Sequence, residues 1–498
     1  MKLELSNKIK TIIILKYFII IFIIQLLLIS NNTDIGKLVY YNIDEYAFYG
    51  SISRIYNGII DTNLRLIFGT GFFNYGWLYF LISFILALPG FIIDNESLIL
   101  IGPRLFSALS SMFSLYFLLK ILNFFNVDFY KSFLTLLFIS LLPGFWSSAI
   151  IFHPDWPYLM LIIISFYYLI KDNFLFGNKY LKAVFFFSLA VSIKIQAIIF
   201  VFLLFLYVII KKKPFLFILK NFILILSSII FIRLLTNPYL FNSEGLTEFY
   251  KDFQTGSSSD LNLNDYLNLY KTKLSVISKY YIDILILIIL GYYNFVFLKQ
   301  KSANKFNIIL FLNLIISFLY TFFIVVHPFE HYYLPIIILF ILNTTIASKG
   351  YKTYLPILLI ICLTQLFNKF NTLHNIFFYK TPQSLILKTN KVTDWCIYND
   401  CNKSNILVYG HITFDFKKAK INYSNIHRGY GDFDKSLLYE YNNHNPGIPI
   451  TKDFFLLSKD SIDSKLVQQI IAIAEKEGYK KIQEDEFNVF FKYLGNSF

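Results

Sequence analysis

The chain has 498 residues, of which 56% are hydrophobic, 20% aromatic and only 15% charged. Its mean hydropathy of +0.57 and its recurring long apolar runs exclude a soluble globular protein. The net charge of +14 does not indicate a nucleic-acid partner, because the lysines form short clusters between apolar runs, as in the cytoplasmic loops of membrane proteins. The composition predicts a polytopic α-helical membrane protein.

The apolar runs predict where the chain crosses the membrane. A helix needs about 20 mostly apolar residues to cross the hydrocarbon core. The first run contains Lys16 and lacks a small-residue cleavage site, which favours a retained anchor over a signal peptide. The runs lie at 9–30, 76–93, 98–122, 130–150, 156–170, 182–193, 195–210, 214–235, 275–298, 306–326, 332–347 and 353–368.

The run at 76–93 is short, follows several glycines and is interrupted by Pro89-Gly90, which favours a segment folded back within the outer interface. Without it, all five lysine clusters fall on the cytoplasmic side; they begin at Lys8, Lys171, Lys211, Lys299 and Lys349. The pattern then predicts about eleven spans, with the N-terminus inside and the C-terminus outside. The alternative is a further plain helix with weaker charge asymmetry.

Three long segments are expected outside the membrane: the first loop at 31–97, a second loop at 236–274 and a tail at 370–498. In the tail, 406–409, 454–457 and 489–493 have the pattern of strands around a helix at 462–478, which predicts a small α/β domain. Cys396 and Cys401 have a spacing that suits a local disulfide in an oxidising compartment, with two unpaired thiols as the alternative, whereas Cys362 lies in a predicted span.

Two acidic motifs stand at the outer ends of spans. Asp44 and Glu45 follow the first span, where an acid or base would be held at headgroup depth; the alternative is a helix cap at Asp44 with Glu45 solvated. Asp155 lies between Pro154 and Pro157, on a turn that the prolines make rigid, and His153 precedes Pro154. It is either a functional acid at membrane depth or a cap of the following helix.

Cations at the outer side are candidates for binding a lipid-linked phosphate. Lys194 lies at the outer end of a short hairpin, where positive charge is otherwise rare; a lysine that extends to the surface explains it nearly as well. Arg54, Arg65 and Arg104 are further outer cations, and one or two of them are expected to join a phosphate site.

The segment from His327 to Pro335 opens a late span. His327 and His331 are four residues apart, which suits metal ligands on one helical face near Glu330, although Pro328 argues against a regular helix. Hydrogen bonding of these groups and Tyr332 to a sugar or phosphate is the stronger interpretation, so we expect no cofactor and keep a divalent metal as the alternative.

Together these segments resemble the GT-C superfamily of membrane glycosyltransferases, in particular the branch of the protein mannosyltransferases and the lipid A aminoarabinose transferase. The resemblance covers roughly residues 1–350 in order and spacing. It rests on the stretches Asp44 to Ala47, Gly102 to Leu109, Asp155 to Pro157 and His331 to Pro335.

The resemblance implies a transmembrane GT-C domain at 1–369 with interfacial helices in its first outer loop, followed by a small extracytoplasmic α/β domain at 370–498. It places the catalytic acid at Asp44 and a second acidic position at Asp155, with Glu45 and Asp155 orienting acceptor or loop. One departure is Asn74-Tyr75-Gly76, where relatives often have a Lys-Pro or His-Pro pair, so donor phosphate contacts or acceptor specificity are open there.

The expected activity is inverting transfer of a monosaccharide from a polyprenyl-phosphate donor to an acceptor hydroxyl at the outer face of a bacterial inner membrane. Asp44 would act as base, Lys194, Arg104 and Arg54 would bind the donor phosphate, and His153, Glu330, His331 and Tyr332 would bind substrate. The acceptor, whether glycan, lipid or protein, stays open. The alternatives are a polysaccharide polymerase or ligase, and a non-catalytic flippase or transporter.

Overall fold

The computed structural model describes residues 2–494 apart from 36, 39–41, 70–74, 244, 248, 251–262, 299–303, 326–328, 352, 379–381, 411, 422–425, 430–452, 460–463 and 477. The chain forms two compact units. The first contains residues 1–31 and 48–379, and the second contains residues 32–47 and 380–498.

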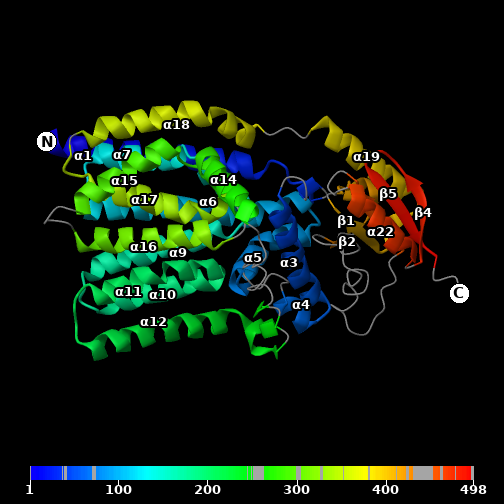
Figure 1. Cartoon of the computed structure of the whole chain (residues 1–498), viewed down its shortest axis with the longest axis horizontal. Helices are drawn as coiled ribbons and strands as arrows, with labels where there is room; N and C mark the ends of the chain where they lie inside the picture. The colour runs from blue at the N-terminus through cyan, green and yellow to red at the C-terminus, as the bar shows by residue number, and fades with distance from the viewer. Residues whose placement is uncertain are drawn as a thin grey trace. The chain divides into compact units, whose positions relative to one another are not determined.

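The first unit is a helical bundle in which the long helices run side by side (Figure 1). Its first part comprises α1 (Lys2–Ile29), α3 (Ile43–Ile60, shared with the second unit), α4 (Leu64–Phe68), α5 (Trp77–Ile92), α6 (Glu96–Phe124), α7 (Phe129–Ser140), α8 (Pro143–Ala149), α9 (Asp155–Asp172) and α10 (Asn178–Ile193). It continues with η1 (Ile195–Phe200), α11 (Val201–Ile209), α12 (Phe215–Thr236), η2 (Pro238–Phe241), α14 (Leu263–Tyr280), α15 (Ile284–Leu298), α16 (Lys305–Phe323), η3 (Glu330–Tyr332), α17 (Leu334–Ala347) and α18 (Tyr354–Phe377).

Length and composition identify membrane-spanning helices among the described residues. Six segments are long and apolar enough to cross a bilayer, and the pair α7 and α8 adds a seventh if it counts as one bent span. The chain is thus an integral membrane protein, as its composition predicts. Shorter apolar helices include α5, which is the run that we expect to fold back, so the number of eleven spans stays a prediction.

The predicted span at 130–150 is not one straight helix. It is broken between α7 and α8 by a bend of 64°. The physical reason lies in Pro143, which occupies the first turn of α8 and cannot donate the backbone hydrogen bond that would continue α7. Trp146 then holds the corner, because its Nε1 donates to the carbonyl of Ser140 over 2.7 Å.

Several buried cations close the carboxyl ends of neighbouring helices. Nη1 of Arg104 donates to the carbonyls of Ile29 and Asn31 at the end of α1, over 3.0 and 2.6 Å. Nζ of Lys131 donates to the carbonyls of Lys349 and Tyr351 just beyond α17, over 2.7 and 2.9 Å. Arg233 and Lys273 make equivalent contacts with the ends of α10 and α16. The last carbonyls of a helix lack internal partners and carry partial negative charge, so these cations satisfy them away from water.

The second unit contains a five-stranded mixed sheet in the order β2-β1-β3-β5-β4. Its strands are β1 (Ile406–Tyr409), β2 (Ile426–Gly429), β3 (Phe454–Ser458), β4 (Tyr479–Glu484) and β5 (Asn488–Tyr493). Strand β1 pairs in parallel with β2 and β3, whereas β5 is antiparallel to β3 and β4. The helical elements after residue 380 are α19 (Gln383–Tyr398), η4 (Cys401–Lys403), α20 (Phe416–Ala419) and α22 (Ser464–Lys476).

Alternation along the strands explains how this sheet is covered. One face places Leu407, Phe455 and Phe491 against Val467 and Ile470 of α22. The alternate residues point to the opposite face, where Trp395 of α19 stacks on Phe490 with ring centroids 4.5 Å apart. The small α/β fold predicted for the tail is therefore present, with its three predicted strands and helix in place. Cys396 and Cys401 are both buried free thiols, as is Cys362.

Candidate functional site

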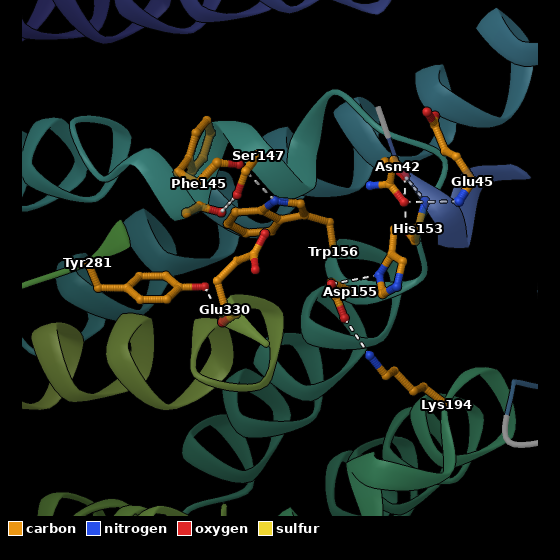
Figure 2. A network of polar contacts seen from close by, with 12 residues as sticks. Asn42, Glu45, Phe145, Ser147, His153, Asp155, Trp156, Lys194, Tyr281 and Glu330 are labelled. Carbon is orange, nitrogen blue, oxygen red and sulfur yellow. Dashed lines mark hydrogen bonds and ion pairs between the residues drawn. The ribbon is translucent and has the colours of Figure 1, made fainter. Parts of the chain in front are cut away.

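A cluster of three charged or titratable side chains is buried at one end of the bundle (Figure 2). Oδ1 of Asp155 lies 2.7 Å from Nζ of Lys194, and Oδ2 lies 2.6 Å from Nδ1 of His153. Neither Asp155 nor Lys194 has any exposed side-chain surface. A buried carboxylate of this kind requires compensating cations or hydrogen bonds, and here Lys194 supplies the charge.

The local sequence explains why these residues meet. Pro154 immediately precedes α9, so Asp155 is the first residue of that helix. Lys194 follows the last residue of the neighbouring helix α10, in an extended conformation with φ of −145°. The two helices pack against each other, so the start of one meets the end of the other. Asp155 does not cap α9, and Lys194 does not reach the surface; both simpler explanations of these residues are wrong.

Three tyrosine rings surround the ammonium of Lys194. Its Nζ lies 5.4 Å from the ring centroids of Tyr75 and Tyr158 and 5.5 Å from that of Tyr332. Within about 6 Å a ring face attracts a cation through its quadrupole. The rings come from the first loop, α9 and η3, so Lys194 joins three separated segments of the first unit.

The segment of Tyr75 is docked onto the end of α10 through its backbone. The amide of Gly76 donates to the carbonyl of Ile193 over 2.8 Å, and Tyr75 forms an isolated antiparallel bridge with Lys194. The amide of Trp77, at the start of α5, donates to Oδ1 of Asn237 over 2.7 Å. Only glycine fits at 76, because a Cβ there would lie 1.5 Å from the carbonyl oxygen of Ser192.

His153 is held by contacts on several sides. Oγ of Ser107, in the Gly102 to Leu109 stretch of α6, donates to the carbonyl of His153 over 2.9 Å. The ring of His153 lies against those of Phe48, Tyr75 and His331, with the His331 centroid 4.7 Å away. His331 is also nearly buried and packs on Tyr332. The structure thus unites five predicted site residues, namely His153, Asp155, Lys194, His331 and Tyr332.

Glu330 is the first residue of η3, and its backbone carbonyl links this turn to Tyr281. Its carbonyl accepts a hydrogen bond of 2.7 Å from Oη of Tyr281, which Figure 2 shows pointing at this turn. His327 lies outside the described residues. The predicted i, i+4 metal pair of His327 and His331 is therefore untested; His331 itself lies in the short 3-10 turn η3. His153 and His331 offer two imidazoles to a divalent ion, and the contact of Asp155 with Nδ1 of His153 is the kind that orients a ligating ring.

Asp44 and Glu45 lie in the first turn of α3. Oδ1 of Asn42 accepts a hydrogen bond of 3.0 Å from the amide of Glu45, so Asn42 serves as the helix cap that the alternative assigned to Asp44. Glu45 is 1% exposed, which contradicts the alternative in which its side chain is solvated. The negative charges of both residues are favourable at this helix N-terminus.

The predicted phosphate-binding arginines have different surroundings. Arg104 is buried and its Nη1 closes the end of α1, so it has a structural task that its motif did not reveal. Arg54 on α3 is exposed, and its Nη1 lies 3.5 Å from the carbonyl of Gly69. Sequence reasoning missed Tyr75, Tyr158, Ser107 and Asn237. Two of them gave a signal: Ser107 lies in the Gly102 to Leu109 stretch that carries the resemblance, and Tyr75 lies in the segment that departs from the family pattern.

Comparison with protein-family models finds no match, and comparison with curated proteins finds none either. Among solved structures, ArnT from Cupriavidus metallidurans bound to undecaprenyl phosphate has a TM-score of 0.53 and 10% identity, over 96% of this chain and 97% of ArnT. The apo state of that protein gives a TM-score of 0.48, 12% identity and 98% coverage of both chains. The arabinofuranosyltransferase AftD from Mycobacteria gives 0.45 and 11% identity, over 85% of this chain and 35% of AftD.

The likeness to the bound ArnT structure extends over nearly the whole of both chains, and it establishes a shared fold. ArnT is a GT-C glycosyltransferase. This protein is therefore an integral membrane protein with the GT-C fold, which is the fold that the resemblance of its motifs implies.

Proposed function

We propose that the protein is an inverting glycosyltransferase that moves a monosaccharide from a polyprenyl-phosphate donor to an acceptor hydroxyl at the outer face of a bacterial inner membrane. The observation that carries the proposal is the buried Lys194–Asp155 pair, located in a fold that the undecaprenyl-phosphate complex of ArnT shares over 96% of this chain. A fold alone does not define an activity, so the chemistry of the cluster is essential to the proposal.

In the proposed reaction, the carboxylate of Asp44 removes the proton of the acceptor hydroxyl. The acceptor oxygen then forms a bond to the anomeric carbon while the bond from that carbon to the phosphate oxygen breaks, and polyprenyl phosphate leaves with the bonding electrons. Lys194 has three N–H donors, of which one is directed at Asp155. A second would stabilise the negative charge of the leaving phosphate in a site that excludes water.

The other residues would orient these groups. Asp155 fixes the ammonium of Lys194 and the ring of His153, and His331, Tyr332 and Glu330 would contact the sugar or the acceptor. Arg54 would add a second, exposed contact to the phosphate, whereas Arg104 is left out because its Nη1 already closes α1. The catalytic part would be the domain at 1–369, with the domain at 370–498 outside the membrane.

Native mass spectrometry of detergent-purified protein tests the proposal and names the donor. Asp44→Asn is compared with wild type and with Asp34→Asn, a matched control in the same segment whose carboxylate pairs with Lys37 over 2.6 Å. We expect an intact polyprenyl-phosphate sugar on Asp44→Asn, and the discharged polyprenyl phosphate on wild type and Asp34→Asn. An oligosaccharide-diphosphate lipid on all three would overturn the monosaccharide transferase in favour of a polymerase, ligase or flippase.

A further inference from the structure

A completely buried tyrosine, Tyr281, lies outside the cluster of His153, Asp155 and Lys194 and contacts the turn η3. This turn carries two of the rings that pack against the cluster. Tyr281 follows α14 and has no exposed surface. Its Oη donates to the carbonyl of Glu330 over 2.7 Å, and Glu330 opens the 3-10 turn η3. The same turn carries His331, whose ring lies 4.7 Å from that of His153, and Tyr332, whose ring lies 5.5 Å from Nζ of Lys194.

The Tyr281 ring fits in its position only because residue 144 is a glycine. A Cβ added at Gly144 of α8 would lie 2.3 Å from Cε1 and 2.5 Å from Cζ of Tyr281, well inside the distance of any real contact. The ring is rigid and buried, so it has no room to give way. Gly144 is the second residue of α8, in the second half of the bent span.

Helix α8 is itself fixed to the start of α9. Nε1 of Trp156, the residue after Asp155, donates to the carbonyl of Phe145 over 3.2 Å, and the two rings meet edge to face at 5.0 Å. Figure 2 shows Trp156, Phe145 and Tyr281 with Glu330 around the same end of the bundle. One continuous set of contacts therefore runs from Asp155 through α8 and Tyr281 to η3.

We propose that Tyr281 is a positioning residue that holds η3, and with it the rings of His331 and Tyr332, against His153 and Lys194, and that Gly144 is required to admit it. This inference deepens the proposed function and rests on it for its consequence in catalysis. Its geometric part, the placement of η3, is independent of any reaction.

The test combines Tyr281→Phe, Gly144→Ala and their double variant. Tyr281→Phe keeps the ring and removes the hydroxyl, whereas Gly144→Ala displaces the ring. Because both act through one contact, we expect each to lower kcat for sugar transfer, by roughly tenfold for the loss of one hydrogen bond. The double variant should be no worse than the more damaging single one, as for residues that act as a unit.

The matched control is Tyr354→Phe. Tyr354 is also fully buried, and its hydroxyl lies 3.3 Å from Oγ1 of Thr345, at the far end of the helix α17 that follows η3. The Tyr354→Phe variant loses a comparable hydroxyl, but its side chain does not contact η3. We expect a similar fall in Tm for Tyr281→Phe and Tyr354→Phe, and a fall in kcat for Tyr281→Phe alone.

A second measurement needs no activity. Diethyl pyrocarbonate modifies accessible imidazoles, and peptide mass spectrometry follows His331 against the exposed His374 on α18 as internal reference. We expect Tyr281→Phe to accelerate modification of His331 and leave His374 unchanged. An unchanged rate for His331 would overturn the inference while leaving the proposed function intact. Accelerated modification in a protein whose wild type transfers no sugar would uphold the placement of η3 and overturn the proposed function instead.

Discussion

Nζ of Lys194 and Oδ1 of Asp155 lie 2.7 Å apart although the two residues are 39 positions apart in the chain and neither side chain is exposed. Each group depends on the other, because a buried charge that loses its partner keeps its full desolvation penalty. Because of this dependence, substitutions of one or both residues distinguish a loss of stability from a loss of catalysis.

The first prediction concerns the removal of Lys194. Lys194→Met keeps the length of the side chain and leaves Asp155 buried without its cation, so the free energy of unfolding should fall by about 3–5 kcal/mol. Asp155→Asn together with Lys194→Met removes both charges and should recover most of that loss, without recovering sugar transfer. Thermal unfolding in detergent and a transfer assay measure the two effects.

A matched control for that pair exists in the same unit. Nζ of Lys369 lies 2.6 Å from Oδ1 of Asp283, but Asp283 is partly exposed, so Lys369→Met should cost no more than about 1 kcal/mol. If the double variant at 155 and 194 were as unstable as Lys194→Met alone, the ion pair would not be the source of the loss.

A substitution of Arg104 tests whether this residue binds the donor phosphate or only closes the end of α1. Arg104→Gln leaves the carbonyls of Ile29 and Asn31 with a weaker donor, so we expect a lower Tm by the equivalent of about 1–3 kcal/mol and an unchanged KM for the donor. Steady-state kinetics with varied donor concentration decide the matter. A raised KM at unchanged Tm would return Arg104 to the phosphate site.

Two glycine substitutions should have opposite effects. Gly76→Ala places a Cβ against the carbonyl of Ser192, which must shift the Tyr75 segment away from Lys194, so transfer should fall at least tenfold and stability by about 1–3 kcal/mol. Gly291→Ala on α15 meets nothing within 4 Å and should stabilise the helix by about 0.5–1 kcal/mol. Equal behaviour of the two variants would exclude the close backbone contact at Gly76.

The loop before α15 predicts a pH dependence. Burial acts to raise the pKa of Asp283, but the hydrogen bonds from Lys369 and Asn368, the charge of Lys369 and a hydrogen bond from Ser278 outweigh it and lower the pKa below its usual value of 3.8. A lowered pKa in the folded state means that the contribution of Asp283 to stability is complete above pH 3.8 and is lost as the pH falls through the folded value. The Tm difference between wild type and Asp283→Asn should therefore be constant from pH 7 to 5 and shrink in stronger acid. A difference that stays constant into strong acid would contradict the ion pair.

The sequence predicted those parts of the molecule that depend on local pattern. Short apolar runs located β1, β3 and β5, and long apolar runs located the long helices. Strand β4 was missed because only its first residue, Tyr479, is buried, so it lacks the alternation of a half-buried strand. Strand β2 was also not predicted.

The candidate site was predictable in its members but not in its contacts. Lys194 stood out because it breaks the charge pattern of the loops, yet only the packing of α9 against α10 reveals Asp155 as its partner. Arg104 shows the converse case, since its motif suggested ligand binding whereas its contacts are to the end of α1. The chain has 37 tyrosines, and nothing in the sequence distinguishes Tyr158 or Tyr281 from the others.

The cations that close helix ends also constrain how the protein is made. The carbonyls that bind Lys131 lie 217 to 220 residues further along the chain, so they have not been synthesised when α7 first enters the bilayer. Until α17 arrives, the ammonium must stay hydrated among the lipid headgroups. The contacts of Lys131 are therefore completed only after α17 and the residues that follow it have been synthesised, and a chain arrested before α17 would leave this ammonium without its carbonyl partners.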